Sequence, residues 1–131
     1  MLERLIQLEK NIAQLEAMKL EHSKTEFSAS TQSQWALRYG LIESIQIVID
    51  TACAICNKNN LGTPKNYADC LRLLSEFRYV DEKLSKTLIK IVGLRNLLIH
   101  EYTTIDNKRL YDFLSELDVF RDYARSVSRY L

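Results

Sequence analysis

The chain has 131 residues and a mass of 15.3 kDa, and its 18 Lys and Arg residues against 17 Asp and Glu residues give a formal net charge of +1. That length fits one domain covering residues 1–131, and the near-neutral charge excludes a surface coated with basic residues for general nucleic-acid binding. With 47% hydrophobic residues, 3 Gly and 1 Pro, the composition excludes a disordered chain and favours an all-α fold over a turn-rich β-fold.

Apolar residues at helical spacing predict five helices, over residues 2–24, 33–57, 67–77, 82–100 and 107–131. A polar stretch over residues 28–33 separates the first two helices, and the loop 57–66, which holds the only Pro, separates the second from the third. Asp106 is the expected N-cap of the fifth helix. Because the connections are short, the sequence predicts an antiparallel helical bundle.

The ends and apolar runs of the chain bear on where the protein works. The first predicted helix does not resemble a signal peptide, because charged residues interrupt it at Glu3, Arg4, Glu9 and Lys10. No apolar run approaches the roughly 20 residues that cross a bilayer. We therefore expect a cytoplasmic protein with reduced thiols and no membrane contact.

Three cysteines, an odd number, do not form a disulfide framework. Cys53 and Cys56 form a C-x-x-C pair inside the second predicted helix, which is a spacing that redox and zinc sites use. A zinc ion needs two further ligands, and nothing near Cys70, His22 or His100 completes a site. We expect no metal, and we interpret these cysteines as small buried apolar residues.

The second predicted helix places Arg38 within an apolar arc. Arg38 either lines a cleft or forms a buried ion pair, and we favour the ion pair. Glu43 and Asp50 share one face of the same helix and are the natural partners for a buried Arg. The two carboxylates also suggest a metal site, but no third ligand converges on them.

The fourth predicted helix is a local basic element, with four cationic residues and no acid between Lys83 and His100. Lys83, Lys86 and Lys90 fall on the side opposite the apolar arc, where they either follow an RNA backbone or form a solvated face. Arg95 falls inside the apolar arc. It either pairs with an acid such as Asp50 or Glu43, or it lines a cleft or a dimer interface where it awaits an anion.

The end of this helix and the residues after it have the pattern R-N-x3-H-x-Y, formed by Arg95, Asn96, His100 and Tyr102. Arg95 and His100 are about 140° apart on a regular helix and do not share a face, whereas Asn96 and His100 do. The pattern resembles the motif of HEPN-domain proteins and is closer still to that of the HepT-type toxins. With the long second helix and the loop after it, the resemblance covers roughly residues 33–131.

The resemblance implies a specific activity. HepT-type proteins are metal-independent endoribonuclease toxins that act as homodimers, with the Arg and His of both subunits in one cleft. Their antitoxin is a nucleotidyltransferase of the MNT type, which attaches AMP to the Tyr of the motif and silences the toxin. By this resemblance Arg95, Asn96 and His100 are catalytic, Tyr102 is the modified residue, and no cofactor is needed.

Cleavage of RNA without a metal needs a base for the 2′-hydroxyl, an acid for the leaving oxygen and positive charge on the phosphate. His performs either proton transfer and Arg binds phosphate oxygens, so a symmetric dimer supplies one His100 for each proton step. The alternative is a catalytically silent HEPN-like helical module that binds a partner protein. A plain helical bundle without a ligand leaves Arg95 unexplained.

Overall fold

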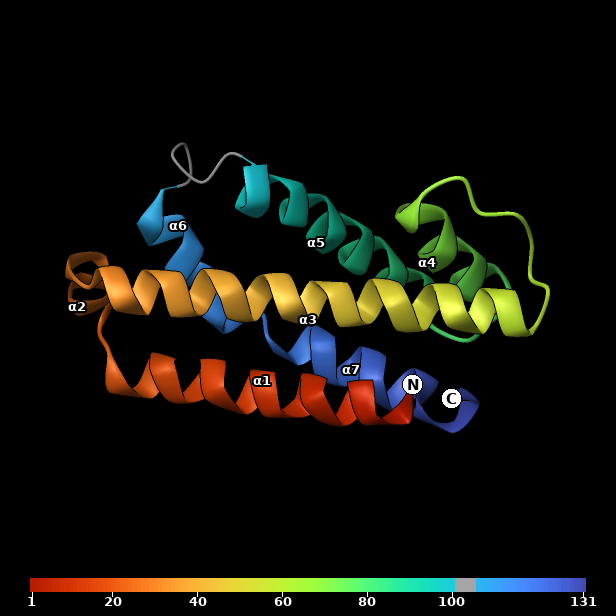
Figure 1. Ribbon diagram of the computed structural model, residues 1–131, viewed down its shortest axis with the longest axis horizontal. Helices are drawn as coiled ribbons and strands as arrows, with labels where there is room; N and C mark the ends of the chain where they lie inside the picture. The colour runs from red at the N-terminus through yellow and green to blue at the C-terminus, as the bar shows by residue number, and fades with distance from the viewer. Residues whose placement is uncertain (101–105) are drawn as a thin grey trace.

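The computed structural model describes residues 1–100 and 106–131 (Figure 1). Every regular element in these residues is helical, which confirms the predicted all-α bundle. The α-helices are α1 (Leu2–Glu21), α2 (Lys24–Ala29), α3 (Thr31–Lys58), α4 (Tyr67–Glu76), α5 (Glu82–His100), α6 (Asn107–Asp112) and α7 (Asp118–Val127). Two short 3₁₀ helices, η1 (Phe113–Ser115) and η2 (Ser128–Tyr130), follow α6 and α7.

The predicted break over residues 28–33 is confirmed at Ser30, which separates α2 from α3. The helix α3 begins at Thr31, two residues before the predicted start, and a further break after Glu21 ends α1. Ser23 and Glu26 form a capping box that starts α2 directly after α1. Ser30 then caps α3, its side chain accepting a hydrogen bond from the amide of Ser33 at 3.2 Å. Ser23 and Ser30 are therefore the N-caps of two successive helices, and the helix start at Ser23 was not predicted.

The predicted fifth helix, over residues 107–131, is not continuous in the structure. Asp106 caps α6 as expected, accepting a hydrogen bond from the amide of Lys108 at 2.9 Å. The chain leaves helical geometry at Glu116 and restarts as α7. The bend lets α6 pack on α2 and α3 while α7 packs on α1 and α5, and Leu114 and Leu117 are buried beside it. Tertiary packing, which a periodic pattern does not reveal, decides this break.

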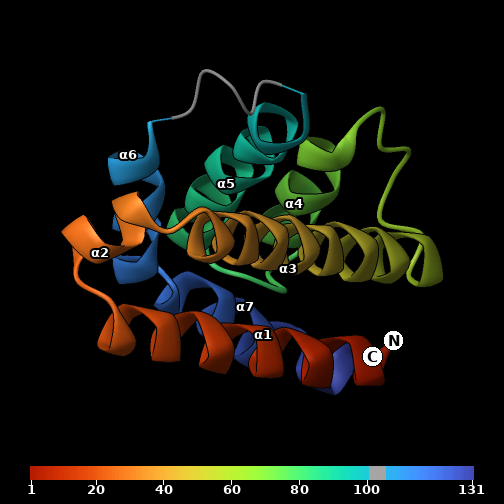
Figure 2. The ribbon, with the colours of Figure 1, turned by 60° about the vertical axis from the view of Figure 1, so that its left-hand side comes forward.

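The long helix α3 is the centre of the bundle, with α1 on one side and α4 and α5 on the other (Figures 1 and 2). It packs against α1, α2, α4, α5, α6 and α7. One window of α3 has a mean hydropathy of 1.4, enough by length and composition to cross a membrane, but 56% of that window is buried inside the protein. Its apolar surface is thus accounted for by its position in the core.

The expectation of reduced thiols is contradicted by a disulfide between Cys53 on α3 and Cys70 on α4. The two Cα atoms are 5.2 Å apart, because α4 packs directly on α3. Cys56 remains free and buried, and burial raises the pKa of its thiol. The C-x-x-C pair is therefore divided between a cross-link and an apolar residue, which spacing along a single helix does not reveal.

Candidate active site on the second half of α5

Arg95 is half-buried, although the helical wheel places it inside the apolar arc of its helix. Leu88, Ile91 and Leu98 on the same helix are buried in the core. The Nε atom of Arg95 is buried, and it has no hydrogen-bond partner among the described residues. A buried, unpaired guanidinium nitrogen is costly in a folded protein, so this side chain is poised for a ligand or for a partner outside the described residues.

A shallow hollow of about 340 Å³ lies beside Arg95, between α5 and the start of α4. Its lining residues are Asn66, Tyr67, Ala68, Ile89, Val92, Gly93, Arg95 and Asn96. Asn66 caps α4 by accepting a hydrogen bond from the amide of Asp69 at 3.0 Å, which fixes the loop at the start of this helix. The wall formed by α4 was not predicted, because only the fold brings Asn66 and Tyr67 next to Arg95.

Asn96 and His100 are exposed on α5, one helical turn apart. Asn96 lines the hollow beside Arg95, whereas His100 is not among its lining residues. The helix is continuous to His100, so the angle of about 140° between Arg95 and His100 holds along this stretch. One protomer therefore brings Arg95 and Asn96 to one hollow and carries His100 on another part of the same helix.

Exposed residues on the second half of α5 differ in character from those on the first half. Lys83, Lys86 and Lys90 are exposed on the first half, and Lys86 lies 3.1 Å from Glu82 in an ion pair. The second half exposes Gly93, Asn96, Leu97 and His100. Gly93 and Leu97, which is 43% exposed, form part of this surface, and these exposed residues include no Lys, Arg, Asp or Glu.

The predicted ion pairs between Arg95 or Arg38 and the carboxylates of α3 do not form. Asp50 pairs instead with Arg4 of α1 at 2.6 Å. Glu43 accepts a hydrogen bond from Asn11 at 3.1 Å and raises the pKa of the Tyr39 phenol through another hydrogen bond. Because α1 packs along α3, its polar residues reach these carboxylates first.

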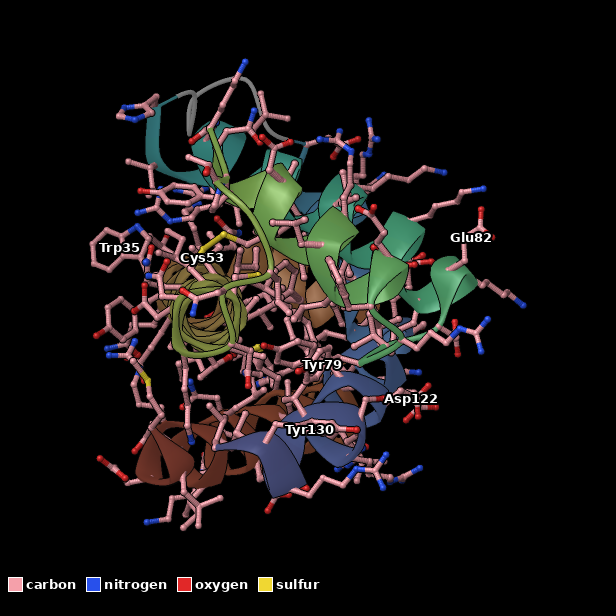
Figure 3. The ribbon with its side chains drawn as sticks, turned by 90° about the vertical axis from the view of Figure 1, so that its right-hand side faces the viewer. Trp35, Cys53, Tyr79, Glu82, Asp122 and Tyr130 are labelled. Atoms are coloured by element: carbon pink, nitrogen blue, oxygen red, sulfur yellow. A yellow bond between two sulfur atoms is a disulfide. The ribbon has the colours of Figure 1, made fainter. Side chains whose placement is uncertain are left out.

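Arg38 is half-buried on α3, and its Nε atom has no hydrogen-bond partner among the described residues. Trp35 and Tyr39 flank it and are 64% and 66% exposed. Trp35 projects outward from α3 on the flank away from Glu82 (Figure 3). Trp35 and Tyr39 thus form part of an exposed aromatic surface.

Tyr102 lies outside the described residues. Within the described residues, no three His, Cys, Asp or Glu side chains gather where a metal ion could bind. The cation at Arg95 and the imidazole at His100 are therefore the groups near this end of α5 that suit phosphate chemistry.

Comparison with known proteins identifies a family. The sequence model of the family described as ribonuclease HepT-like matches residues 8–127. The mRNA nuclease HepT of Shewanella oneidensis is 27% identical over 68% of this chain and 79% of its own length. The tRNA nuclease HepT of Aphanizomenon flos-aquae is 27% identical over 86% of this chain and 78% of its own length.

Solved structures share the fold over nearly the whole chain. A tri-AMPylated Shewanella oneidensis HEPN toxin in complex with MNT antitoxin superposes with a TM-score of 0.88 at 22% identity, covering 97% of this chain and 95% of that one. The Bacillus subtilis cytosolic protein YutE, of unknown function, superposes with a TM-score of 0.73 at 24% identity, covering 95% of this chain and 88% of its own. At these identities the likeness establishes the helical fold.

Proposed function

Because the chain belongs to the ribonuclease HepT-like family, we propose that it is a cytoplasmic toxin that cuts RNA internally without a metal ion. One observation carries this proposal: Arg95 is half-buried beside a hollow, and no described carboxylate neutralises it. A guanidinium that is desolvated but unpaired binds a phosphate more strongly than one already held in an ion pair.

Each residue of the motif has a distinct role in this proposal. Arg95 binds the phosphate being cleaved and stabilises the charge that develops on it. His100 transfers a proton, either from the 2′-hydroxyl or to the leaving 5′-oxygen. Asn96, one turn before His100 and beside Arg95, orients the imidazole or donates to a phosphate oxygen. The relatives named as mRNA and tRNA nucleases support RNA as the substrate class.

The active form in this proposal is a homodimer. His100 does not line the hollow of its own Arg95, so Arg95 of one protomer and His100 of its partner complete one cleft. The exposed face of Gly93, Asn96, Leu97 and His100 supports this arrangement, because a glycine lets a second backbone approach closely and a leucine gains from burial. Two protomers then supply both His100 side chains for the two proton transfers.

We assign the antitoxin as a nucleotidyltransferase of the MNT type and Tyr102 as the residue it modifies. The superposable HEPN toxin in complex with MNT antitoxin supports this assignment. Tyr102 follows His100 by two residues, so an attached AMP places a bulky anion close to the cleft. Steric exclusion and like-charge repulsion then keep the RNA phosphate away from Arg95.

The test is expression in bacteria of wild type, Arg95→Ala and His100→Ala, followed by cleavage of total RNA by each purified protein in excess EDTA. We expect the wild type to slow growth and cut RNA, and each variant to lose about 100-fold or more in rate. Lys10→Ala, an exposed change on α1, is the matched control. A wild type that leaves RNA intact with or without EDTA favours the silent interaction module instead, and activity only with metal removes the metal-independent mechanism.

A further inference from the structure

A wide hollow lies at the opposite end of α5 from His100. It has a volume of about 1030 Å³ and lies between the turn from α4 to α5 and the C-terminal end of α7. We call it the turn groove, and its charged lining residues are Arg72, Glu76, Arg78, Asp81, Glu82, Lys86, Arg125 and Arg129. Neither the sequence motif nor the proposed active site includes it.

The turn groove has more cationic than acidic lining residues, although two of its cations are paired with carboxylates beside it. Arg72 lies 2.7 Å from Asp69, and Arg125 lies 3.5 Å from Asp122. Five of its lining residues are cationic and three are acidic. Asp81 is used by the fold, since its carboxylate accepts a hydrogen bond from the amide of Leu84 at 2.7 Å at the start of α5. Glu82 is paired with Lys86 at 3.1 Å. Within the described residues, neither Arg78 nor Arg129 has a carboxylate at ion-pair distance, so both cations are available to an anion.

Arg78 has a backbone conformation that favours glycine. Its φ is +64°, and it follows α4 at the position where a helix commonly ends with a left-handed residue. The Tyr79 amide donates to the Leu74 carbonyl at 2.8 Å and the Arg78 amide donates to the Ser75 carbonyl at 3.1 Å, which is the Schellman pattern. Arg at this position makes the protein less stable than Gly would. A non-glycine residue in a strained backbone conformation is a reason to examine its side chain for a function.

Aromatic rings lie beside these cations. Tyr79 and Tyr130 pack edge to face with their ring centres 4.5 Å apart, and the guanidinium of Arg129 lies 4.9 Å from the centre of the Tyr130 ring. Figure 3 shows Tyr79 and Tyr130 together at this end of the molecule, with Glu82 and Asp122 toward its outer edge. Of these two rings Tyr79 lines the groove, whereas Tyr130 lies outside its lining and supports Arg129. Cations that bind phosphates beside a tyrosine that stacks on a base are a combination that single-stranded nucleic acids favour.

The turn groove and the hollow beside Arg95 are neighbours along α5. Ile89 lines both the turn groove and the hollow beside Arg95. From Lys86 to Arg95 along α5 is about 14 Å, which roughly four stacked nucleotides span. A strand lying along the junction of α4 and α5 therefore reaches from one to the other.

We propose that the turn groove binds the backbone of single-stranded RNA that flanks the cleaved phosphate, with Arg78 and Arg129 as its principal phosphate contacts. The identity of the strand as substrate rests on the proposed function, but the binding does not require cleavage. Of the three lysines considered from the sequence, Lys86 alone lines this groove. Lys86 is paired with Glu82 and Lys83 and Lys90 lie outside the groove, so none of these lysines is a principal phosphate contact.

The test measures binding of a fluorescent 12-nucleotide single-stranded RNA by anisotropy, in full-length protein carrying His100→Ala so that the RNA stays intact. Added to this background, Arg78→Gly removes the side chain and relieves the backbone, while Arg78→Lys keeps the charge. Asn60→Gly is the matched control, because Asn60 also has a positive φ, of +50°, and does not line the groove. The double change Arg78→Gly with Arg129→Ala tests the two contacts together, with Lys10→Ala as the charge control.

We expect the double variant to bind RNA about tenfold more weakly. The slope of log affinity against log salt concentration should become shallower by about 0.7 for each phosphate contact removed. Arg78→Gly should melt at the same or a higher temperature than its parent, and the two controls should bind RNA as their parent does. The proposal is overturned if the double variant binds RNA with unchanged affinity. It is also overturned if the double variant loses only its binding to a nucleotidyltransferase partner. If wild type fails to cleave RNA, the proposed function fails, while the anisotropy result still decides whether the groove binds RNA.

Discussion

The guanidinium of Arg4 lies 2.6 Å from the carboxylate of Asp50, and this ion pair joins α1 to α3. Asp50 also accepts a hydrogen bond from Gln46 at 2.7 Å, so its two oxygens are both engaged. The carboxylate that seemed a natural partner for Arg95 is therefore occupied. Arg4 therefore has a structural role, whereas Arg95 is available to a ligand.

Replacement of the two arginines should separate stability from activity. Arg4→Ala should lower the free energy of unfolding by about 0.5–1 kcal/mol, since the pair is partly exposed. Arg95→Ala should leave stability unchanged or raise it, because it removes a buried nitrogen that has no described partner. Urea denaturation of both variants checks this. A larger loss for Arg95→Ala than for Arg4→Ala would show that Arg95 is held by an interaction of its own.

The buried hydroxyl of Tyr123 is a second polar contact on which the fold depends. It lies 2.6 Å from the hydroxyl of Thr51 and donates to the Val48 carbonyl at 3.2 Å. Burial raises the pKa of Tyr123 well above its ordinary range, so the phenol remains neutral. Tyr123→Phe should lower the free energy of unfolding by about 1–2 kcal/mol. An exposed change, Tyr67→Phe, is the control, and equal stability of the two variants would contradict this role.

The disulfide between Cys53 and Cys70 should make stability depend on redox conditions. It closes a separation of 17 residues and ties α4 to α3, so its loss should cost about 3 kcal/mol. The melting temperature of wild type should fall when dithiothreitol is added. The double variant Cys53→Ala with Cys70→Ala should melt near the reduced wild type and be insensitive to dithiothreitol. A wild type that melts at one temperature in both conditions would mean that the thiols are reduced in solution.

These contacts show which properties a single sequence predicts. Periodicity along α5 predicts that Leu88 and Arg95 share one apolar arc, and Leu88 is buried in the core whereas Arg95 is half-buried beside a hollow. Asp50 and Cys70 were assigned wrongly because their partners, Arg4 and Cys53, lie on other helices. Pairing between helices depends on how they pack, and one sequence does not reveal it.

The same limit applies to the candidate site. The motif at Arg95, Asn96 and His100 is local in sequence, so it was found before the fold was known. The cations of the turn groove come from α4, α5, α7 and the turns between them, and no short pattern unites them. No sequence pattern indicates a role for Arg78, since its left-handed backbone conformation appears only in the structure.

The ion pair between Glu16 on α1 and Arg121 on α7 should make stability depend on acid. The hydrogen bond from Arg121 lowers the pKa of Glu16, so the folded state holds this carboxylate ionised more strongly than the unfolded chain does. This stabilisation is therefore present above the ordinary Glu range and is lost as the pH falls through that range toward the lowered pKa. Glu16→Gln should be less stable than wild type at pH 7 and closer to it at pH 3. Urea titrations at the two values measure the difference, and an equal gap at both pH values would contradict the assignment.

Gly93 offers a direct test of the proposed homodimer. It lies exposed within α5, and a Cβ added there meets no atom of the described residues within 4 Å. An isolated protomer has no use for glycine at this position, because Gly93→Ala should stabilise an exposed helix by about 0.5–1 kcal/mol. A partner backbone packed closely against α5 explains the glycine. In that arrangement a large side chain at position 93 should weaken the dimer.

Gly93→Glu should therefore shift the protein toward monomer and abolish RNA cleavage, since it separates Arg95 of one protomer from His100 of its partner. Ala13→Glu, a small residue changed to the same acid on the exposed side of α1, should remain dimeric and active. Sedimentation velocity over a range of concentrations measures the association, and circular dichroism checks that both variants are folded. If Gly93→Glu dimerises as wild type does, the contact lies away from this face. Arg95 and His100 of separate chains then do not meet there, and catalysis has to be built within one protomer.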